Sequence, residues 1–460
     1  MMSEWKEVQF SELCTVTRGA SPRPIKDFIS DEGMPWVKIA DATSSDSRFI
    51  EETKEKIKLE GVPKSKSVYP GDLILSNSAT PGLPKFMKIE ACIHDGWMLL
   101  KDFKGLDKRF AYWLLLHERK NLVVQGNGSV FTNLKTDILK NHIVKIPAEN
   151  KQIEIAEVLD SVQEKIELNR QTNQTLEQIA QAIFKSWFVD FEPVKAKIAA
   201  LEAGGSEDDA LLAAMQAIAG NALFASDAAD ADAATQLARL QTEHPEQYTT
   251  LRATAELFPS AMQESELGEI PEGWEPVRLE HYIELAYGKA LKKTDRVEGP
   301  YRVYGSGGIT GTHNDFLVQG PSIILGRKGT IGSIYWENQN FYPIDTTYYV
   351  IVKNGCTLSF AYYLLQTLGL KGMNTDAAVP GLNRNNVYRL ETPCYPKAII
   401  DRFTEMATSN FSKIANCNAE NLSLVELRDT LLPKLLSGEL SVSAAADQIT
   451  QAEEAVNVQS

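Results

Sequence analysis

Residues 154–188 read EIAEVLDSVQEKIELNRQTNQTLEQIAQAIFKSWF, and this stretch decides the fold that the sequence predicts. Its apolar residues and two asparagines recur in alternating steps of four and three, the 3.5-residue period of a coiled-coil seam. The seam positions are Ile155, Leu159, Val162, Ile166, Asn169, Asn173, Leu176, Ala180, Ile183 and Trp187. The stretch therefore predicts one long helix of about 52 Å, at ~1.5 Å per residue.

The same spacing returns near the end of the chain, at Phe403, Ala407, Asn410, Ile414, Cys417, Asn421, Leu424, Arg428, Leu431 and Leu435. Asn173 and Asn421 occupy equivalent positions, and a buried Asn in a seam sets the register at a cost in stability. Pro433 should kink or end this helix near its last turn. A heptad seam alone often indicates self-association. Two matched helices in one chain instead predict antiparallel pairing with each other.

Each seam helix follows a globular block, and the two blocks repeat one another. Each opens with a Trp-led strand, at residues 5–10 and 274–279, and each later carries the motif Phe-Ala-Tyr-x-Leu-Leu, at 110–115 and 360–365. A turn with an apolar strand recurs at 70–76 and 320–326, and a loop with Asn133-Leu134 matches Leu382-Asn383. Short strands, glycine turns and short helices predict a mixed α+β domain in each block. The predicted molecule is a pseudo-twofold barbell, with the blocks at opposite ends of an intramolecular coiled coil.

The predicted boundaries follow from this repeat. They are 1–148 for the first block, 149–194 for the first helix, 195–268 for an Ala-rich acidic spacer with short helices near 211–218 and 233–240, 269–396 for the second block, 397–440 for the second helix, and 441–460 for a polar, frayed tail.

The net charge of −14 is unevenly distributed. Residues 1–147 carry +3 and residues 269–396 are neutral, whereas the spacer carries −8. The blocks could therefore contact DNA. Binding by the chain alone should be weak, because neutralisation of phosphates supplies most of the affinity. A more basic partner is expected to close around the duplex.

The sequence also excludes several classes of protein. It has no apolar run long enough for a membrane helix and no apolar signal segment in its first ten residues. Its five cysteines are scattered and form no Cys-x-x-Cys pair, which indicates reduced thiols and a cytoplasmic protein.

Motifs for catalysis are absent. We find no Walker A pattern, no Asn/Asp-Pro-Pro-Tyr motif of amino-methyltransferases and no histidines at metal-ligand spacing. The glycine-rich residues 305–311 favour a flexible turn over a phosphate cradle. Glu52-Thr-Lys54 faintly resembles a metal nuclease, but residues 48–58 more simply predict a solvated helix. We therefore predict no catalytic residue, metal or cofactor. A methyltransferase or nuclease with a recognition half and a coiled-coil scaffold indifferent to DNA remain as alternatives.

Several motifs together make the chain resemble a known family along nearly its whole length. They are KSWFVDFEPV at 185–194, ESELGEIPEGW at 264–274, LLPKLLSGE at 431–439, GMPWVKIAD at 33–41, GRKGTIG at 326–332 and PIDTTY at 343–348. The chain resembles the specificity subunits of type I restriction–modification enzymes. The resemblance implies two target recognition domains, each reading one half of a split site in double-stranded DNA.

The resemblance also implies that the helices act as a ruler and dock two modification subunits, which carry the methyl-transfer chemistry. Restriction subunits with motor and nuclease activities would join for cleavage. A rigid spacer of ~50 Å suits half-sites about one DNA turn, ~34–36 Å, apart.

Candidate DNA contacts are side chains that can reach base edges or phosphates. In the first block they are Thr17, Arg18, Ser21, Arg23, Lys26, Lys38, Ser76, Asn77, Ser78, Lys85, Asn127, Ser129 and Asn133. In the second block they are Lys289, Lys292, Lys293, Arg302, Tyr304, His313, Asn314, Arg327, Lys328, Asn383 and Arg384. By contrast, the spacing of Trp113, Tyr362 and Tyr363 favours helix core. Trp187 and Phe188 are candidates for binding a partner, with packing inside the chain as the alternative.

Overall fold

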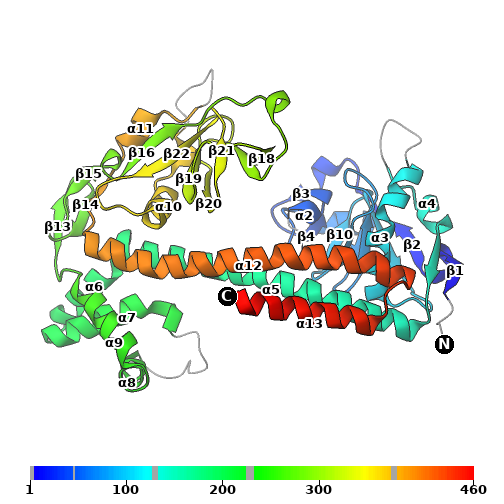
Figure 1. Ribbon diagram of the computed structural model, residues 1–460, viewed down its shortest axis with the longest axis horizontal. Helices are drawn as coiled ribbons and strands as arrows, with labels where there is room; N and C mark the ends of the chain where they lie inside the picture. Colours follow the sequence, from blue (N-terminus) through cyan, green and yellow to red (C-terminus); the bar gives the residue numbers. More distant parts are fainter. Residues whose placement is uncertain (1–4, 45–46, 127–132, 224–232, 374–380, 460) are drawn as a thin grey trace. The chain divides into compact units, whose positions relative to one another are not determined.

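The computed structural model describes residues 5–44, 47–126, 133–223, 233–373 and 381–459 (Figure 1). The chain forms two compact units, of which the first combines residues 1–171 with 417–460 and the second contains residues 172–416. Each unit therefore holds one globular block and a part of each long helix.

The first block contains two five-stranded sheets, with the strand orders β2-β11-β8-β9-β5 and β3-β6-β4-β10-β7. The apolar run Leu73–Leu75 lies fully buried in β8, as expected of a covered strand. The strands of the sheets are β2 Thr15–Arg18, β3 Ile29–Ser30, β4 Met34–Val37, β5 Phe49–Ile50, β6 Glu55–Ile57, β7 Lys66–Val68, β8 Leu73–Ser76, β9 Pro84–Met87, β10 Ala91–Ile93 and β11 Trp97–Lys101. A ribbon of β1 Lys6–Gln9 and β12 Ile143–Ile146 and the helices α1 Phe10–Leu13, α2 Ile39–Thr43, α3 Lys108–Gly126 and α4 Thr136–Asn141 complete it.

The second block has a four-stranded sheet ordered β16-β22-β19-β20 and a three-stranded sheet ordered β18-β17-β21. Their strands are β16 Ile283–Tyr287, β17 Tyr301–Gly305, β18 Gly308–His313, β19 Ser322–Gly326, β20 Ile334–Glu337, β21 Phe341–Pro343 and β22 Thr347–Val352. A hairpin of β13 Met262–Ser265 and β14 Gly268–Pro271, a ribbon of β15 Pro276–Arg278 and β23 Glu391–Pro393, and the helices α10 Leu358–Thr367 and α11 Arg384–Tyr388 surround them. The glycine-rich residues 305–311 form the β17–β18 hairpin.

The two blocks share a strand plan, which confirms the predicted repeat. In each, an opening strand pairs antiparallel with the closing one, as β1 with β12 and β15 with β23. A central strand lies between two antiparallel neighbours, β11 between β2 and β8, and β22 between β16 and β19. One detail of the predicted alignment is wrong. Leu134 and Leu382 are equivalent, since their amides donate to the carbonyls of Asn77 and Arg327, each at 2.8 Å.

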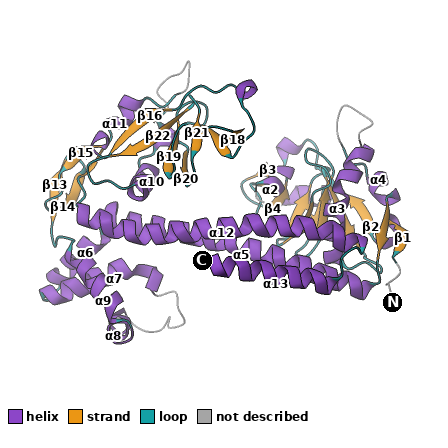
Figure 2. Cartoon of the chain, viewed as in Figure 1, coloured by secondary structure: helices purple, strands orange, loops and turns teal. Residues whose placement is uncertain are grey.

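The seam segments form α5 Glu149–Phe188 and α12 Lys397–Ser437, each an unbroken helix (Figure 2). In the first unit, Val162 and Ile166 of α5 pack against Leu424 of α12. In the second unit, the rings of Phe184 and Phe403 lie 5.4 Å apart. The start of α5 thus meets the end of α12 and the reverse, which confirms the predicted antiparallel pairing. Pro433 lies in the last turn of α12, which ends four residues later.

The asparagine that faces Asn421 is Asn169 and not Asn173. Asn169 Nδ2 donates to Asn421 Oδ1 at 3.1 Å and to Glu420 Oε2 at 2.6 Å. Both asparagines are buried. In an antiparallel pair, the residue opposite depends on how far the helices slide along each other, so equivalent seam positions need not meet.

The spacer is more structured than predicted. It forms α6 Glu192–Glu202, α7 Glu207–Leu223, α8 Ala233–Glu243 and α9 Pro245–Glu256, whose Met215, Leu237 and Ala255 belong to the core of the second unit. Lys197 is buried there and donates to the carbonyl of Phe258 at 2.6 Å. These residues form a packed helical subdomain because their apolar side chains share one core.

The predictions for the tail and for the charged stretch are wrong. Residues Val442–Gln459 form helix α13, whose Ala445 is fully buried in the core of the first unit. The stretch 48–58 contains β5 and β6 and no solvated helix. Asp41, an acidic residue upstream of Glu52-Thr-Lys54, accepts hydrogen bonds from the amides of Lys38 and Lys54. It therefore has a structural role at the start of α2.

Replacing Asn169 with Leu should destabilise the chain by about 1–3 kcal/mol, because the buried Oδ1 of Asn421 would lose its donor. Replacing Asn421 with Leu as well removes that acceptor, so the double variant should unfold at the wild-type denaturant midpoint or above it. Urea denaturation followed by circular dichroism measures both. A double variant less stable than Asn169→Leu would contradict the hydrogen bond between Asn169 and Asn421.

Candidate nucleic-acid interface

In the first block, the loop after β2 contacts the loop before β11. We call the place where these two loops meet, at residues 18–23 and 94–96, the crossing. Arg18 Nε donates to the backbone carbonyl of Asp95 at 3.0 Å. Ser21 Oγ donates to the Asp95 carboxylate at 2.5 Å, and Arg23 Nη2 lies 3.5 Å from the same group. The bond from Ser21 holds the pKa of Asp95 below its ordinary value, so the carboxylate stays ionised beside these cations.

Backbone contact explains why a glycine lies in this crossing. A Cβ on Gly19 would lie 2.1 Å from the carbonyl oxygen of His94, so a side chain cannot fit without moving the loop. Asn77, which follows β8, donates from Nδ2 to the Asp95 carbonyl at 2.9 Å. The ends of the neighbouring strands β2 and β8 and the start of β11 therefore meet at the crossing, joined by hydrogen bonds to Asp95.

The second block repeats this crossing with different side chains. A Cβ on Gly288 would lie 2.2 Å from the carbonyl oxygen of Ile344. Arg327, which follows β19 as Asn77 follows β8, donates from Nη1 to the Asp345 carbonyl at 3.2 Å. The backbone of the crossing is thus shared by the two blocks, and the side chains it presents differ.

Two arginines lie against one exposed tyrosine at the second crossing. The guanidinium carbons of Arg327 and Arg384 lie 4.8 Å and 5.1 Å from the centre of the Tyr287 ring. Tyr287 is 46% exposed. Such contacts between cation and ring hold a guanidinium in a defined orientation. Sequence reasoning named both arginines but missed Tyr287 and Asp95. Tyr287 lies two residues before the predicted contact Lys289, whereas no motif marks Asp95 in the sequence.

The predicted contact residues divide by exposure. Those exposed are Arg18, Arg23, Lys26, Asn133, Lys289, Lys292, Lys293, Arg302, Asn314, Lys328 and Asn383. Those partly exposed are Thr17, Ser21, Lys38, Ser78, His313, Arg327 and Arg384. Those buried are Ser76, Asn77, Lys85 and Tyr304, and Asn127 and Ser129 lie outside the described residues.

The buried residues have structural roles in place of the predicted contacts. Lys85 donates to the carbonyl of Ser47 and is 4% exposed. Tyr304 donates its hydroxyl to the buried carboxylate of Glu337 at 2.8 Å. Neither side chain can reach a DNA base without unfolding its surroundings. Lys38 is held 2.5 Å from Glu55 and is therefore partly neutralised.

Trp187 and Phe188 are core residues and not surface for a partner. Both are at most 1% exposed, and their rings lie 5.6 Å from Phe258 and 5.0 Å from Phe360, respectively. Packing within the chain is therefore the alternative that holds. The core prediction is confirmed for Trp113 and Tyr363, which are buried, while Tyr362 is partly exposed beside Trp336.

Among the described residues, no group of three or more His, Cys, Asp or Glu side chains is arranged to hold a metal ion. No helix in the same part of the chain has the length and apolar character needed to cross a membrane.

Comparison with known proteins assigns the class. The family model of the type I restriction modification DNA specificity domain matches residues 2–178 and 271–388, and the chain belongs to this family. The HindI specificity subunit of Haemophilus influenzae is 28% identical over 480 residues, covering 95% of this chain and all of that protein. The MjaIX specificity subunit of Methanocaldococcus jannaschii is 23% identical over 475 residues, covering 95% and 94%.

The fold agrees with this assignment. The crystal structure of the S subunit from a type I system of M. genitalium matches with a TM-score of 0.50 and 17% identity, covering 94% of this chain and 96% of that one. By its family, the chain is a specificity subunit, which recognises DNA sequence and is not itself an enzyme.

Replacing Tyr304 with Phe should destabilise the chain by about 1–3 kcal/mol, because the buried Glu337 carboxylate loses one hydrogen-bond donor. Arg302 would still lie 3.1 Å from that carboxylate. Denaturant unfolding measures the loss. If the variant keeps its stability but recognises altered DNA sequences, Tyr304 contacts DNA and the structural role is wrong.

Proposed function

We propose that the chain reads a bipartite DNA site, one half with residues 1–148 and the other with residues 269–396. These two segments are called the first and second recognition domains below. The repeated crossing, with one backbone and two sets of side chains, is the observation that carries the proposal. A shared scaffold with variable side chains suits two domains that perform the same task on different bases.

The proposed contacts are the exposed and partly exposed residues at and around each crossing. In the first recognition domain, Arg18, Arg23 and Lys26 would reach phosphates or guanine edges, with Ser78 and Asn133 beside them. In the second, the paired Arg327 and Arg384 suit bidentate binding of guanine. Lys289, Lys292, Lys293, Lys328, Asn314 and Asn383 would add phosphate and base contacts.

We further propose that α5 and α12 set the spacing between the half-sites and dock two modification subunits, which restriction subunits join for cleavage. Each helix is continuous over 40 or 41 residues, about 60 Å at ~1.5 Å per residue. The net charge of −14 supports the need for partners, because such a chain attracts the DNA backbone poorly by itself.

Exchanging residues 1–147 for the corresponding segment of another specificity subunit should change one half of the modified site and leave the other unchanged. The reason is that each crossing is built within its own block. Sequencing that detects methylated bases, in a host carrying the whole operon, compares the two sites. A change in both halves would refute modular reading.

Inserting seven residues after Thr172 and seven after Cys417 should lengthen both helices at facing positions, since Asn169 faces Asn421. Seven residues add about 10.5 Å at ~1.5 Å per residue, or roughly three base pairs at ~3.4 Å each. The gap between the methylated half-sites should widen by that amount. An unchanged gap in an active complex would show that the helices do not set it.

A further inference from the structure

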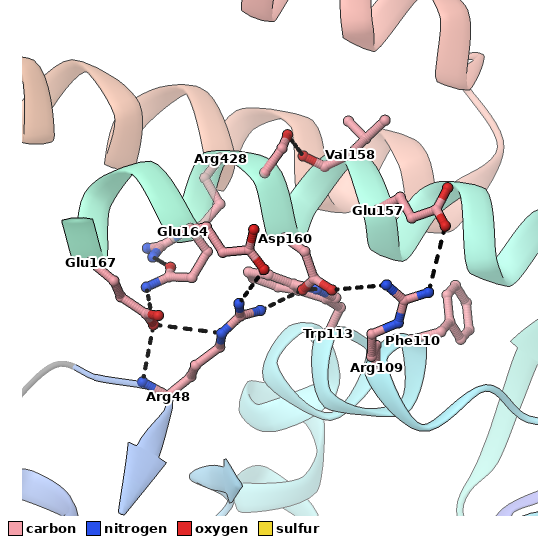
Figure 3. Close-up of polar contacts among 12 residues, drawn as sticks. Arg48, Arg109, Phe110, Trp113, Glu157, Val158, Asp160, Glu164, Glu167 and Arg428 are labelled. Carbon is pink, nitrogen blue, oxygen red and sulfur yellow. Dashed lines mark hydrogen bonds and ion pairs between the residues drawn. The ribbon is translucent and has the colours of Figure 1, made fainter. Parts of the chain in front are cut away.

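One buried arginine connects the first recognition domain to α5. Arg48 is 6% exposed, and its guanidinium lies 2.5 Å from Asp160, 3.0 Å from Glu164 and 3.6 Å from Glu167 (Figure 3). These three acidic residues follow one face of α5 at spacings of four and three. A single side chain from the domain is therefore held at three successive points along the helix.

The domain reaches the same carboxylate a second time, through α3. Trp113 Nε1 donates to Asp160 Oδ1 at 3.0 Å, and Arg109 lies 3.7 Å from Asp160 Oδ2 (Figure 3). The contacts also extend to the other long helix. Gln163 bonds to Glu167 at 3.1 Å and accepts from Arg428 of α12 at 2.7 Å. Domain, α5 and α12 thus share one polar network inside the first unit.

Arg48 is rigidly joined to the crossing that carries the proposed DNA contacts. It immediately precedes β5, and its carbonyl accepts the amide of Phe86 in β9 at 2.9 Å. Strands β5 and β9 belong to the same sheet as β2, β8 and β11, whose ends form the crossing. A shift of Arg48 against α5 would therefore move the whole sheet and its crossing together.

The second unit uses a different kind of contact at the corresponding place. The rings of Trp336 and Phe411 of α12 stack 4.3 Å apart at an angle of 9°. Tyr363 donates to Glu177 of α5 at 3.0 Å. The second recognition domain is thus held by stacked rings together with hydrogen bonds such as that between Thr357 and Thr404 at 2.7 Å. Stacked rings tolerate small shifts better than a network of directed charges.

We infer that Arg48 is a positioning residue that fixes the orientation of the first recognition domain on the helices, and so determines how well that domain alone discriminates its half-site. The inference rests on the proposed function. Buried ion pairs contribute little net stability, since desolvation offsets the attraction, but they favour one geometry over others. Arg48 is too buried to bind DNA itself.

The test uses the complex of the full chain with its modification subunits and three duplexes. One carries the methylated site, and the others carry a single base change in the first or the second half. Each mismatch should weaken wild-type binding at least about fivefold to tenfold. Arg48→Met should lower the discrimination at the first half to about twofold or less and leave that at the second half within twofold of the wild-type value. Arg48→Lys keeps the charge but not the forked guanidinium, so its discrimination at the first half should lie between those of the wild type and Arg48→Met.

Two further measurements separate positioning from other roles. The slope of log affinity against log salt should be unchanged in Arg48→Met, because no phosphate contact is lost. Arg252→Met is the matched control. The described ion pairs of Arg252 are with Asp208 and Glu256 at the surface. This variant should leave the discrimination at both halves unchanged. Glu164→Gln, at a residue whose side chain is 66% exposed, weakens the network without opening the core.

The outcomes are distinct. Equal loss at both halves, or no loss in Arg48→Met and Glu164→Gln, would overturn the inference. If Arg48→Met fails to fold, Arg48→Lys and Glu164→Gln decide by the same ratios. If the wild-type complex itself discriminates at neither half, the proposed function fails and not the role of Arg48 alone.

Discussion

The antiparallel packing of α5 against α12 is the interaction on which both units depend, because each unit contains one end of each helix. It is the reason that residues 417–460 belong with residues 1–171 although most of the chain separates them in sequence. Helix α13 then packs into the core of the first unit. Without the helix pair, neither block would have the surface on which it rests.

The two crossings show how one backbone can serve two recognition tasks. Gly19 and Gly288 allow the same close approach to a neighbouring carbonyl, and Asn77 and Arg327 occupy the same position after a central strand. This close approach involves main-chain atoms only, so the side chains at the crossing can vary without loss of the fold. A short polar Asn and a long Arg stacked on Tyr287 therefore occupy equivalent places.

Much of the fold could be predicted from the sequence, because heptad spacing and an internal repeat are periodic signals. The partner of Asn421 could not be predicted, since the heptad spacing of a helix does not determine how far it is shifted along its partner helix. The roles of Lys85 and Tyr304 depend on Ser47 and Glu337, which only the folded sheets bring close. Arg48 lies 112 positions from Asp160, and a charged stretch gives no sign that one member is buried.

The unequal attachment of the two recognition domains has a physical consequence. Burial raises the pKa of Asp160 even though Arg48 and Arg109 lie beside it, so the network carries a desolvation cost that better apolar packing would avoid. Stability alone does not explain a buried ion-pair network, because the aromatic contacts of the second unit join a domain to the helices without that desolvation cost. Directed charges restrict orientation more than stacked rings do. The first recognition domain is therefore the one whose reading should depend on a few exact contacts with the helix beneath it.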